Sequence, residues 1–159
     1  MSDSKNPKTL PNPLIVEGAL DTEAILRGWE NEARVRNFGA LCVFIGIVRA
    51  EDGIAALSFD IYLPLLELWL QSWQNKARAV DENLRIFMAH ASGDVVVGES
   101  SFACAIASKN RRAALEIYGD FIEDFKANAP IWKYDVKNGA RIYAQDRSKK
   151  LRGAGILAE

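Results

Sequence analysis

The stretch FKANAPIWK, residues 125–133, joins a helix to a strand within a few residues. Asn128-Ala129-Pro130 ends the helix, because a proline disfavours helical backbone geometry in the residue before it. The run that begins with Ile131 and Trp132 is rich in residues that favour strands. Lys126 precedes this turn and Lys133 follows it. Lysines usually lie on solvated surface, but two like charges around one tight turn repel each other and call for an explanation.

Working outward from this turn, hydrophobic periodicity predicts three main helices and a set of short strands. The helices are expected at residues 22–36, from Pro64 to about residue 80, and at 110–127, with Asp21 capping the first. Strands are expected at residues 14–20, 39–49, 55–62, 84–90, 100–108, 131–136 and 140–145, with a turn-rich link at 91–99 and a tight KNG turn at 137–139. Neighbouring strands between single helices predict an α+β fold with a mainly antiparallel or mixed sheet.

The chain has 159 residues, which suits one domain with its own core. Residues 1–13 are polar with three prolines, and we expect a mobile N-terminal segment there. We expect one domain over residues 14–145 and a C-terminal tail over 146–159 in which no element is evident.

Composition excludes several classes of function. The net charge of -1 gives no electrostatic basis for binding nucleic acid or an anionic membrane. No apolar run is long enough to span a bilayer and no signal peptide is evident, so we expect a cytoplasmic protein. Cys42 and Cys104 lie in apolar strand-like runs and are expected to be reduced and structural. One histidine and two separated cysteines offer no metal site and no evident cofactor site.

Four cations lie where predicted elements end: Arg49, Arg111, Lys126 and Lys133. Each has an ordinary structural explanation; Lys126, for example, interacts favourably with the dipole at a helix C-terminus. Together they favour a site, because sites are commonly built at such edges. Two neighbouring lysines would lower each other's pKa, which favours an amine that acts as nucleophile or base. His90 is expected to have a hydrogen-bonded structural role.

Several segments together resemble the large, catalytic subunit of molybdopterin synthase. They are FIGIVR followed by a loop, LSFDIY before a helix, SKNR at the start of a helix and, most specifically, FKANAPIWK. The resemblance runs in order from about Leu14 to Gln145. It implies an α/β hammerhead fold and a homodimer that binds a small ubiquitin-like subunit at each end, giving a heterotetramer.

The implied function is sulfur transfer. The small subunit carries a C-terminal Gly-Gly thiocarboxylate, which donates sulfur to cyclic pyranopterin monophosphate, also called precursor Z. Two sulfurs give the dithiolene of molybdopterin, in the biosynthesis of the molybdenum cofactor. No metal or other cofactor is implied for the subunit itself.

The resemblance also implies roles for individual residues. Lys126 would lie near the incoming thiocarboxylate and help its transfer, and Lys133 would hold or polarise the pterin. The implied substrate-binding residues are Ile47, Val48, Arg49, Asn110, Arg111, Lys126, Lys133, Tyr134 and Asp135.

Two positions depart from the family pattern. Asn110 stands where the family has a histidine, and Ile47 where it often has a lysine. Asparagine can form hydrogen bonds but cannot take up a proton near neutral pH. Asn110 therefore cannot act as an acid or base in the way a histidine at this position could.

Helix geometry adds a prediction about assembly. Arg111 and Lys126 lie on one helix and, at about 1.5 Å per residue, are roughly 22 Å apart. A single small pterin cannot comfortably touch both. If both serve one site, Arg111 must come from a neighbouring subunit, and the active sites must be completed across a symmetric dimer interface.

Two alternatives stay open beside the sulfurtransferase. The chain could be a binding module of the same fold, which docks the ubiquitin-like protein or a pterin without turnover. It could also be an unrelated α+β domain whose lysines are solvated surface residues. Replacement of Lys126 with alanine separates the sulfurtransferase, which would lose product formation, from the binding module, which has none to lose. For the unrelated domain, neither Lys126→Ala nor Lys133→Ala should change partner binding or anion binding.

Overall fold

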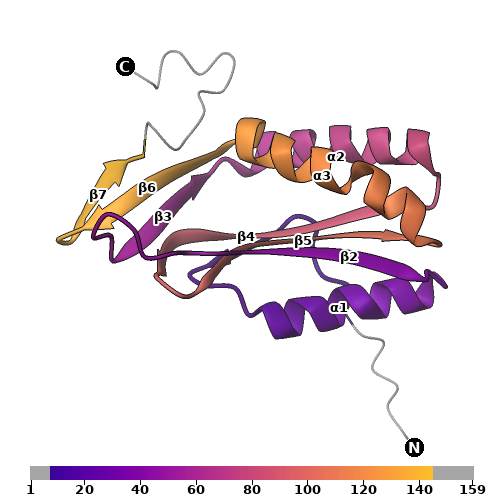
Figure 1. Cartoon of the computed structure of the whole chain (residues 1–159), viewed down its shortest axis with the longest axis horizontal. Coiled ribbons are helices and arrows are strands. Elements are labelled where there is room, and N and C mark those ends of the chain that lie inside the picture. Colours follow the sequence, from indigo (N-terminus) through magenta and orange to yellow (C-terminus); the bar gives the residue numbers. More distant parts are fainter. Residues whose placement is uncertain (1–7, 145–159) are drawn as a thin grey trace, which may run out of the picture.

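The computed structural model describes residues 8–144 and has two helices on one face of a sheet and a third helix on the opposite face (Figure 1). The helices are α1 (Thr22–Val35), α2 (Leu63–Val80) and α3 (Arg111–Asn128). The strands are β1 (Leu14–Glu17), β2 (Ala40–Ile47), β3 (Ala56–Ile61), β4 (Arg85–Val96), β5 (Ser100–Ser108), β6 (Ile131–Lys137) and β7 (Ala140–Tyr143). The predicted order of helices and strands is confirmed, and so is the α+β class.

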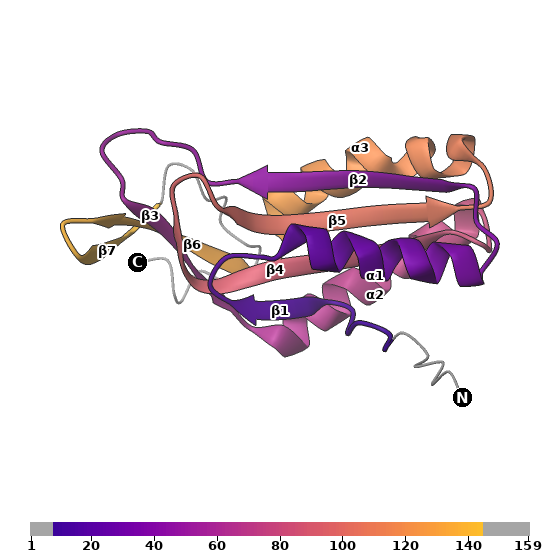
Figure 2. The same cartoon turned by 90° about the horizontal axis from the view of Figure 1, so that it is seen from below.

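The strands form one sheet in the order β2-β5-β4-β3-β6-β7, with β1 added beside β4. All pairs are antiparallel except β1 with β4. The same edge of β4 pairs first with β1, at Ala89–Ser92, and then with β3, at Gly93–Val96. Figure 2 shows the result, with β2 and β1 on opposite sides of the β4–β5 pair.

The prediction of a turn-rich link at residues 91–99 is wrong for most of that range, because β4 continues to Val96. Gly93 takes a φ of +72°, a left-handed conformation that glycine adopts without steric cost. This bend lets one strand pass from the β1 and β5 pairings to the β3 pairing. The turn itself is confined to residues 97–99.

Alternation along β4 and β5 builds a separate core on each face of the sheet. Toward α2 and α3 the two strands direct larger side chains: Ile86, Met88, Phe102, Cys104 and Ile106. Toward α1 they direct mainly alanine, at positions 89, 91, 103, 105 and 107. The small residues leave room for Trp29 of α1, which is 1% exposed and stacks on Phe87 with ring centroids 6.0 Å apart. Both faces of these strands are therefore buried, which explains their nearly continuous apolar sequence.

Local signals account for the ends of several elements. The Asp21 carboxylate accepts a hydrogen bond from the Ala24 N–H at 3.1 Å and caps α1, as predicted. In the β6–β7 hairpin, Asn138 and Gly139 both have positive φ, the geometry that a two-residue hairpin turn requires. At 100° per residue, Leu115 and Phe125 of α3 are predicted to lie in one buried arc with Ala114, Tyr118, Phe121 and Ile122. The prediction is wrong at Leu115, which is 59% exposed. The helix is rotated so that Ala113 and Ile117 face the core instead.

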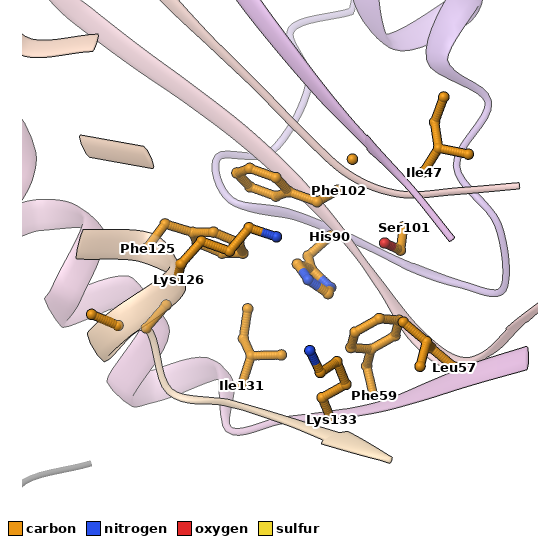
Figure 3. Close-up of a pocket in the computed structure, with 13 residues that line it drawn as sticks. Ile47, Leu57, Phe59, His90, Ser101, Phe102, Phe125, Lys126, Ile131 and Lys133 are labelled. Carbon is orange, nitrogen blue, oxygen red and sulfur yellow. The ribbon is translucent and has the colours of Figure 1, made fainter. Parts of the chain in front are cut away.

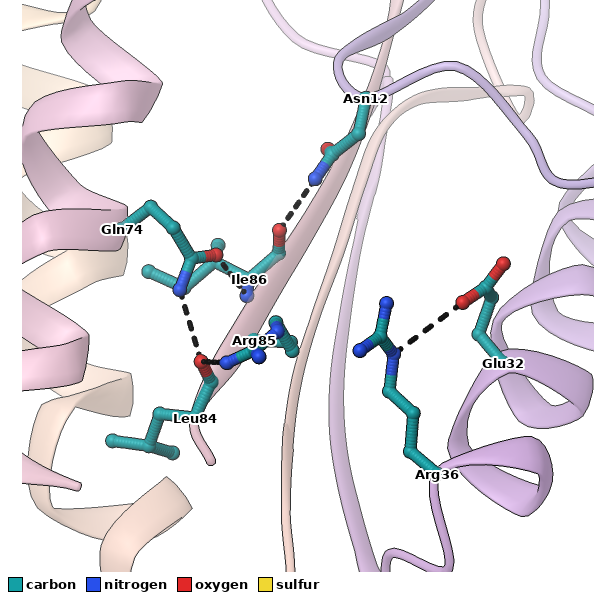
Figure 4. A network of polar contacts seen from close by, with 7 residues as sticks. All are labelled: Asn12, Glu32, Arg36, Gln74, Leu84, Arg85 and Ile86. Atoms are coloured by element: carbon teal, nitrogen blue, oxygen red, sulfur yellow. Dashed lines mark hydrogen bonds and ion pairs between the residues drawn. The ribbon is translucent and has the colours of Figure 1, made fainter. Parts of the chain in front are cut away.

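Polar side chains attach the start of β4 to neighbouring segments (Figure 4). Asn12 donates to the Ile86 carbonyl at 2.7 Å and accepts from the Met88 N–H at 3.0 Å. Gln74 of α2 bonds to the Leu84 carbonyl and to the Ile86 N–H. The end of the segment predicted to be mobile is thus held against β4. Residues 1–7 and the predicted tail, 146–159, lie outside the described residues.

Candidate active site

A pocket of about 160 Å³ opens where β3 and β6 diverge from β4 and β5. Five strands and the last turn of α3 contribute to its wall. The lining residues are Gly46, Ile47, Leu57, Phe59, His90, Ser101, Phe102, Phe125, Lys126, Ala127, Ala129, Ile131 and Lys133. Most of the lining residues are apolar, and four polar side chains converge among them: His90, Ser101, Lys126 and Lys133. This is the usual composition of a small-molecule site.

The turn after α3 brings the two lysines of FKANAPIWK to this pocket. Ala129 ends the helix in an extended conformation, with φ -60° and ψ 137°, as its position before Pro130 favours. The chain then reverses into β6, where Lys133 is paired with Phe59 of β3. Side chains alternate along a strand, so Ile131 and Lys133 share the pocket face. Figure 3 shows the amino groups of Lys126 and Lys133 directed toward the same space.

The pKa values of both pocket lysines are lowered. Partial burial of its amino group lowers the pKa of Lys126, and nearby Glu123 opposes this shift, although the Lys126 side chain as a whole is exposed. Burial lowers the pKa of Lys133, and the positive charge of Lys126 lowers it further. The predicted lowering of one lysine's pKa by the charge of the other is therefore found at Lys133. A lowered pKa makes an amine a better proton donor and a more available base near neutral pH.

Aromatic rings form the back of the pocket. The Phe102 and Phe125 rings stack with centroids 3.8 Å apart and an interplanar angle of 5°. The imidazole of His90 packs edge-on against Phe59 at 4.8 Å. These rings give the pocket an apolar back wall, and electrostatic interactions are stronger beside an apolar surface than in bulk water.

A register shift between β2 and β5 lies at the rim. Gly46 pairs with Phe102, whereas Ile47 pairs with Ser100, so Ser101 is left between two pairs. A β-bulge of this kind redirects a side chain and is common beside active sites. Here it turns Ser101, which is 8% exposed, into the pocket wall.

The last turn of α3 is held to α2 by a shared carboxylate. Asp124 accepts hydrogen bonds from the indole N–H groups of Trp73 and Trp69, at 2.6 and 3.1 Å. It also accepts a bond from the Asn128 side-chain amide at 2.5 Å. These bonds lower the pKa of Asp124, although its burial acts in the opposite direction. The carboxylate therefore fixes the helix end that carries Lys126.

The structure brings together only part of the predicted set. Lys126, Lys133 and Ile47 line the pocket, whereas Arg49 and Val48 do not. The Arg49 side chain is 81% exposed and forms an ion pair with Glu51 at 2.8 Å. Val48 is 2% exposed in the α1-side core.

The two other residues predicted on β6 lie on opposite faces of the strand. Asp135 alternates onto the face of Lys133, whereas Tyr134 lies on the other face. There the Tyr134 ring contacts the Tyr143 ring, and the Arg141 guanidinium lies 4.1 Å from its centroid. Tyr134 is therefore directed away from the pocket.

Asn110 and Arg111 lie at the opposite end of α3 from Lys126. Asn110 caps the helix, and its side-chain oxygen accepts from the Ala113 N–H at 3.3 Å. Arg111 is exposed and lines a separate hollow together with Asn110, Arg112 and Leu115. Within one chain, Arg111 does not reach the lysine pocket.

The pocket also contains residues that sequence reasoning did not assign to it. Phe125 was expected in the core, and the sequence has no periodic signal that places Phe59, Ser101 and Phe102 together. His90 has the predicted hydrogen bond, from Nδ1 to the Ala91 carbonyl, but it also faces the pocket. No group of histidine, cysteine or acidic side chains among residues 8–144 is arranged to hold a metal ion. In the same part of the chain, no helix combines the length and apolar character needed to cross a bilayer.

Comparisons with known proteins identify the family of the chain. The family model of the MoaE protein matches residues 16–128. The molybdopterin synthase catalytic subunit of Helicobacter pylori (strain ATCC 700392 / 26695) is 55% identical over 91% of this chain and 98% of its own length. The human molybdopterin synthase catalytic subunit is 32% identical over 62% of this chain and 54% of its own length.

Solved structures give the same result for the fold. A complex of subunits 1 and 2 of the molybdopterin-converting factor from Helicobacter pylori 26695 contains a chain that matches with a TM-score of 0.84 and 54% identity, covering 91% of this chain and 98% of that one. Molybdopterin synthase from Staphylococcus aureus shares the fold, with a TM-score of 0.69 and 23% identity over 84% of this chain and 97% of that one. The chain belongs to the MoaE family, the molybdopterin synthase catalytic subunits that its FKANAPIWK segment resembles.

Proposed function

We propose that this chain transfers sulfur from the C-terminal thiocarboxylate of a small ubiquitin-like subunit to cyclic pyranopterin monophosphate, in the cytoplasm. The observation that carries the proposal is the placement of Lys126 and Lys133, both with lowered pKa, around one pocket. Two ammonium groups suit a phosphate-bearing substrate and an anionic sulfur donor. The Helicobacter pylori relative was solved as a complex of two subunits, which supports a separate partner.

Sulfur transfer at such a pocket needs few protein groups. The thiocarboxylate sulfur forms a bond to a pterin carbon, an oxygen substituent of that carbon leaves with the bonding electron pair, and a lysine ammonium can protonate it. The product is a thioester between partner and pterin. Water then attacks the thioester carbonyl, so the sulfur remains on the pterin and the partner departs with a C-terminal carboxylate. Two such cycles, each with a fresh thiocarboxylate, give the dithiolene.

The lysines differ in what surrounds them, and we propose different roles. Lys126 lies at the exposed rim and would meet the incoming thiocarboxylate. Lys133 lies on β6, paired with Phe59 of β3, and would hold or polarise the pterin. Gly46, Ala127 and Ala129 keep parts of the wall small, which leaves room for the main chain of an extended Gly-Gly tail.

The cysteines are unsuited to carry the sulfur. Neither Cys42 nor Cys104 belongs to the pocket lining. Burial raises the pKa of Cys104 to about 12 and also raises that of Cys42, so both remain thiols at neutral pH. This fits a reaction in which sulfur arrives already bonded to the partner.

We also propose that two copies of the chain complete each other's sites. Strand β2 is an edge strand with the apolar sequence ALCVFIGI, and none of its residues is fully buried. Its end at Ile47 lines the lysine pocket, whereas its start follows Gly39, whose N–H bonds to the Lys109 carbonyl just before α3. Antiparallel pairing of β2 with β2 of a second copy would cover this edge. It would also direct the partner subunit's Arg111 toward the lysine pocket.

A single-turnover assay tests the sulfur transfer. Purified protein, thiocarboxylated small subunit and cyclic pyranopterin monophosphate are mixed, and molybdopterin is measured as its fluorescent oxidised derivative. Wild-type protein should form product, Lys126→Ala almost none, and Lys8→Ala, which removes an exposed lysine before β1, should resemble wild type. Complex formation without product from the wild type would instead favour a binding module, as the Asn110 and Ile47 departures allow.

A further inference from the structure

His90 is the one titratable pocket residue to which the proposed sulfur transfer assigns no role. It is the only histidine of the chain and is 3% exposed at the floor of the pocket. Phe59, Phe102 and Phe125 surround the imidazole, with ring centroids 4.8, 5.8 and 5.8 Å away. Besides these rings, the imidazole faces its own backbone and the pocket. The pocket is therefore where a polar ligand could contact it.

The hydrogen bond of His90 determines which ring nitrogen carries the proton. Nδ1 lies 2.7 Å from the Ala91 carbonyl oxygen, which can only accept, so Nδ1 must donate. Burial lowers the pKa of His90 to about 4, and the positive charge of Lys126 contributes to the lowering. The imidazole is therefore neutral at physiological pH, and its single proton is on Nδ1. Nε2 retains a free lone pair.

Nε2 is directed to the pocket rather than enclosed. Among residues 8–144, no fully buried side-chain nitrogen or oxygen lacks a hydrogen bond, and no described residue bonds to Nε2. Nε2 therefore reaches the open space of the pocket. Figure 3 shows the imidazole beside the amino groups of Lys126 and Lys133.

The polar side chains of the pocket offer a ligand both hydrogen-bond donors and a hydrogen-bond acceptor. Ammonium groups of Lys126 and Lys133 only donate hydrogen bonds, whereas the Nε2 of a neutral histidine only accepts. A ligand that fills this pocket with its hydrogen bonds satisfied must present acceptors or anionic groups to the lysines and an N–H or O–H donor to His90. A reduced pterin, with ring N–H groups and a phosphate, has both.

We propose that His90 is a substrate-binding residue, whose Nε2 accepts a hydrogen bond from a ring N–H or a hydroxyl of the bound pterin. This inference rests on the proposed function, because that function names the pterin. It assigns His90 a contact with substrate through a neutral acceptor, not a role as proton donor.

Nuclear magnetic resonance of the wild-type chain tests the proposal directly. Since the chain has one histidine, ¹⁵N-labelled histidine yields the ring signals of His90 alone. At neutral pH, Nδ1 should resonate as a protonated nitrogen and Nε2 as an unprotonated one. Addition of cyclic pyranopterin monophosphate should move the Nε2 signal toward that of a hydrogen-bonded acceptor and leave the Nδ1 signal nearly unchanged.

Matched variants measure the contribution to binding. His90→Met has a similar length but no comparable acceptor, and it should weaken pterin affinity about tenfold, as expected for one lost hydrogen bond. His90→Gln keeps an acceptor oxygen and should bind closer to wild type. Thermal unfolding establishes which variants fold, and the wild-type spectrum decides the proposal if neither does.

The outcomes separate this inference from the function on which it rests. Protonated Nε2, or pterin binding that leaves the Nε2 signal unmoved, overturns the role of His90 alone. Absence of any pterin binding to the wild type overturns the proposed function and the His90 contact with it. Equal affinities of the folded Met and Gln variants would also contradict the contact.

Discussion

Burial, and then the positive charge of Lys126, hold the pKa of Lys133 below its ordinary value. The two lysines belong to different elements, the last turn of α3 and the strand β6, and they meet only at the pocket. Because burial is the larger cause, removing the charge of Lys126 would bring the pKa of Lys133 only part of the way back to its ordinary value. The lowered pKa of Lys133 therefore depends on the assembled pocket and not on either lysine alone.

Replacing Lys126 with glutamine should raise the pKa of Lys133 while leaving it below the value of an exposed lysine. The charge of Lys126 is lost in this variant, but the burial of Lys133 remains. Titration of the Lys133 side chain by NMR, with labelled lysine, measures the change. A lower pKa in the variant would mean that the two amino groups do not face each other.

Loss of Lys126 should reduce single-turnover product formation about 100-fold or more, because the incoming thiocarboxylate would lose the ammonium group proposed to meet it. Loss of one such electrostatic contact at a reacting group typically has an effect of this size. Lys133→Ala should in addition weaken pterin binding, since Lys133 is proposed to hold the substrate. The comparison with Lys8→Ala distinguishes a pocket effect from a general loss of positive charge. Full activity of Lys126→Ala would remove the basis of the proposed mechanism.

A mixture of Lys126→Ala and Arg111→Ala should recover activity that neither variant has alone. If sites are completed across a dimer, each mixed dimer has one site with both residues intact, and random exchange gives about a quarter of wild-type activity. The measurement is product formation after subunits have exchanged. A mixture as inactive as its components would show that Lys126 and Arg111 do not act together across an interface.

Acid should destabilise the fold through His90. Its folded-state pKa of about 4 is below the ordinary value of 6.5, so the unfolded chain binds more protons between these values. Stability is therefore full above about pH 6.5 and falls as pH decreases toward 4, by up to about 3 kcal/mol.

Urea unfolding at pH 7 and pH 4.5 measures this loss. His90→Gln is the control, because it keeps every carboxylate and removes only the imidazole. The wild type should lose more stability than the variant over this interval. Identical losses would show that His90 takes up its proton as readily in the folded chain.

Asp124→Ala should destabilise the chain by about 3 kcal/mol, because two indole N–H groups would lose an ionised acceptor. Asp124→Asn keeps one acceptor oxygen and should cost less. Asp120→Ala, one turn earlier on the exposed side of α3, should stay within about 0.5 kcal/mol of wild type. Urea unfolding of the three variants tests this order, and equal effects of Asp124→Ala and Asp120→Ala would contradict the helix-fixing role of Asp124.

Much of the fold could be predicted from local signals. Asp21 caps α1, the Asn138-Gly139 turn closes the last hairpin, and Pro130 ends α3, because each acts through its own backbone neighbours. The prediction of a turn-rich link at 91–99 is wrong because the continuation of this segment as a strand depends on pairing with distant β3. The prediction that Leu115 lies in the core is wrong because the rotation of α3 is set by what packs beneath it.

The sequence by itself determined the order of helices and strands, the family, and the presence of two lysines around one turn. Only the tertiary structure decided that these lysines face a pocket with His90, that Ser101 turns into its wall, and that Arg49 and Arg111 lie elsewhere in the chain. The reason is physical: caps, turns and periodicity depend on residues a few positions apart. A pocket, and the pKa shifts within it, depend on burial and charge from segments that meet only when the sheet forms.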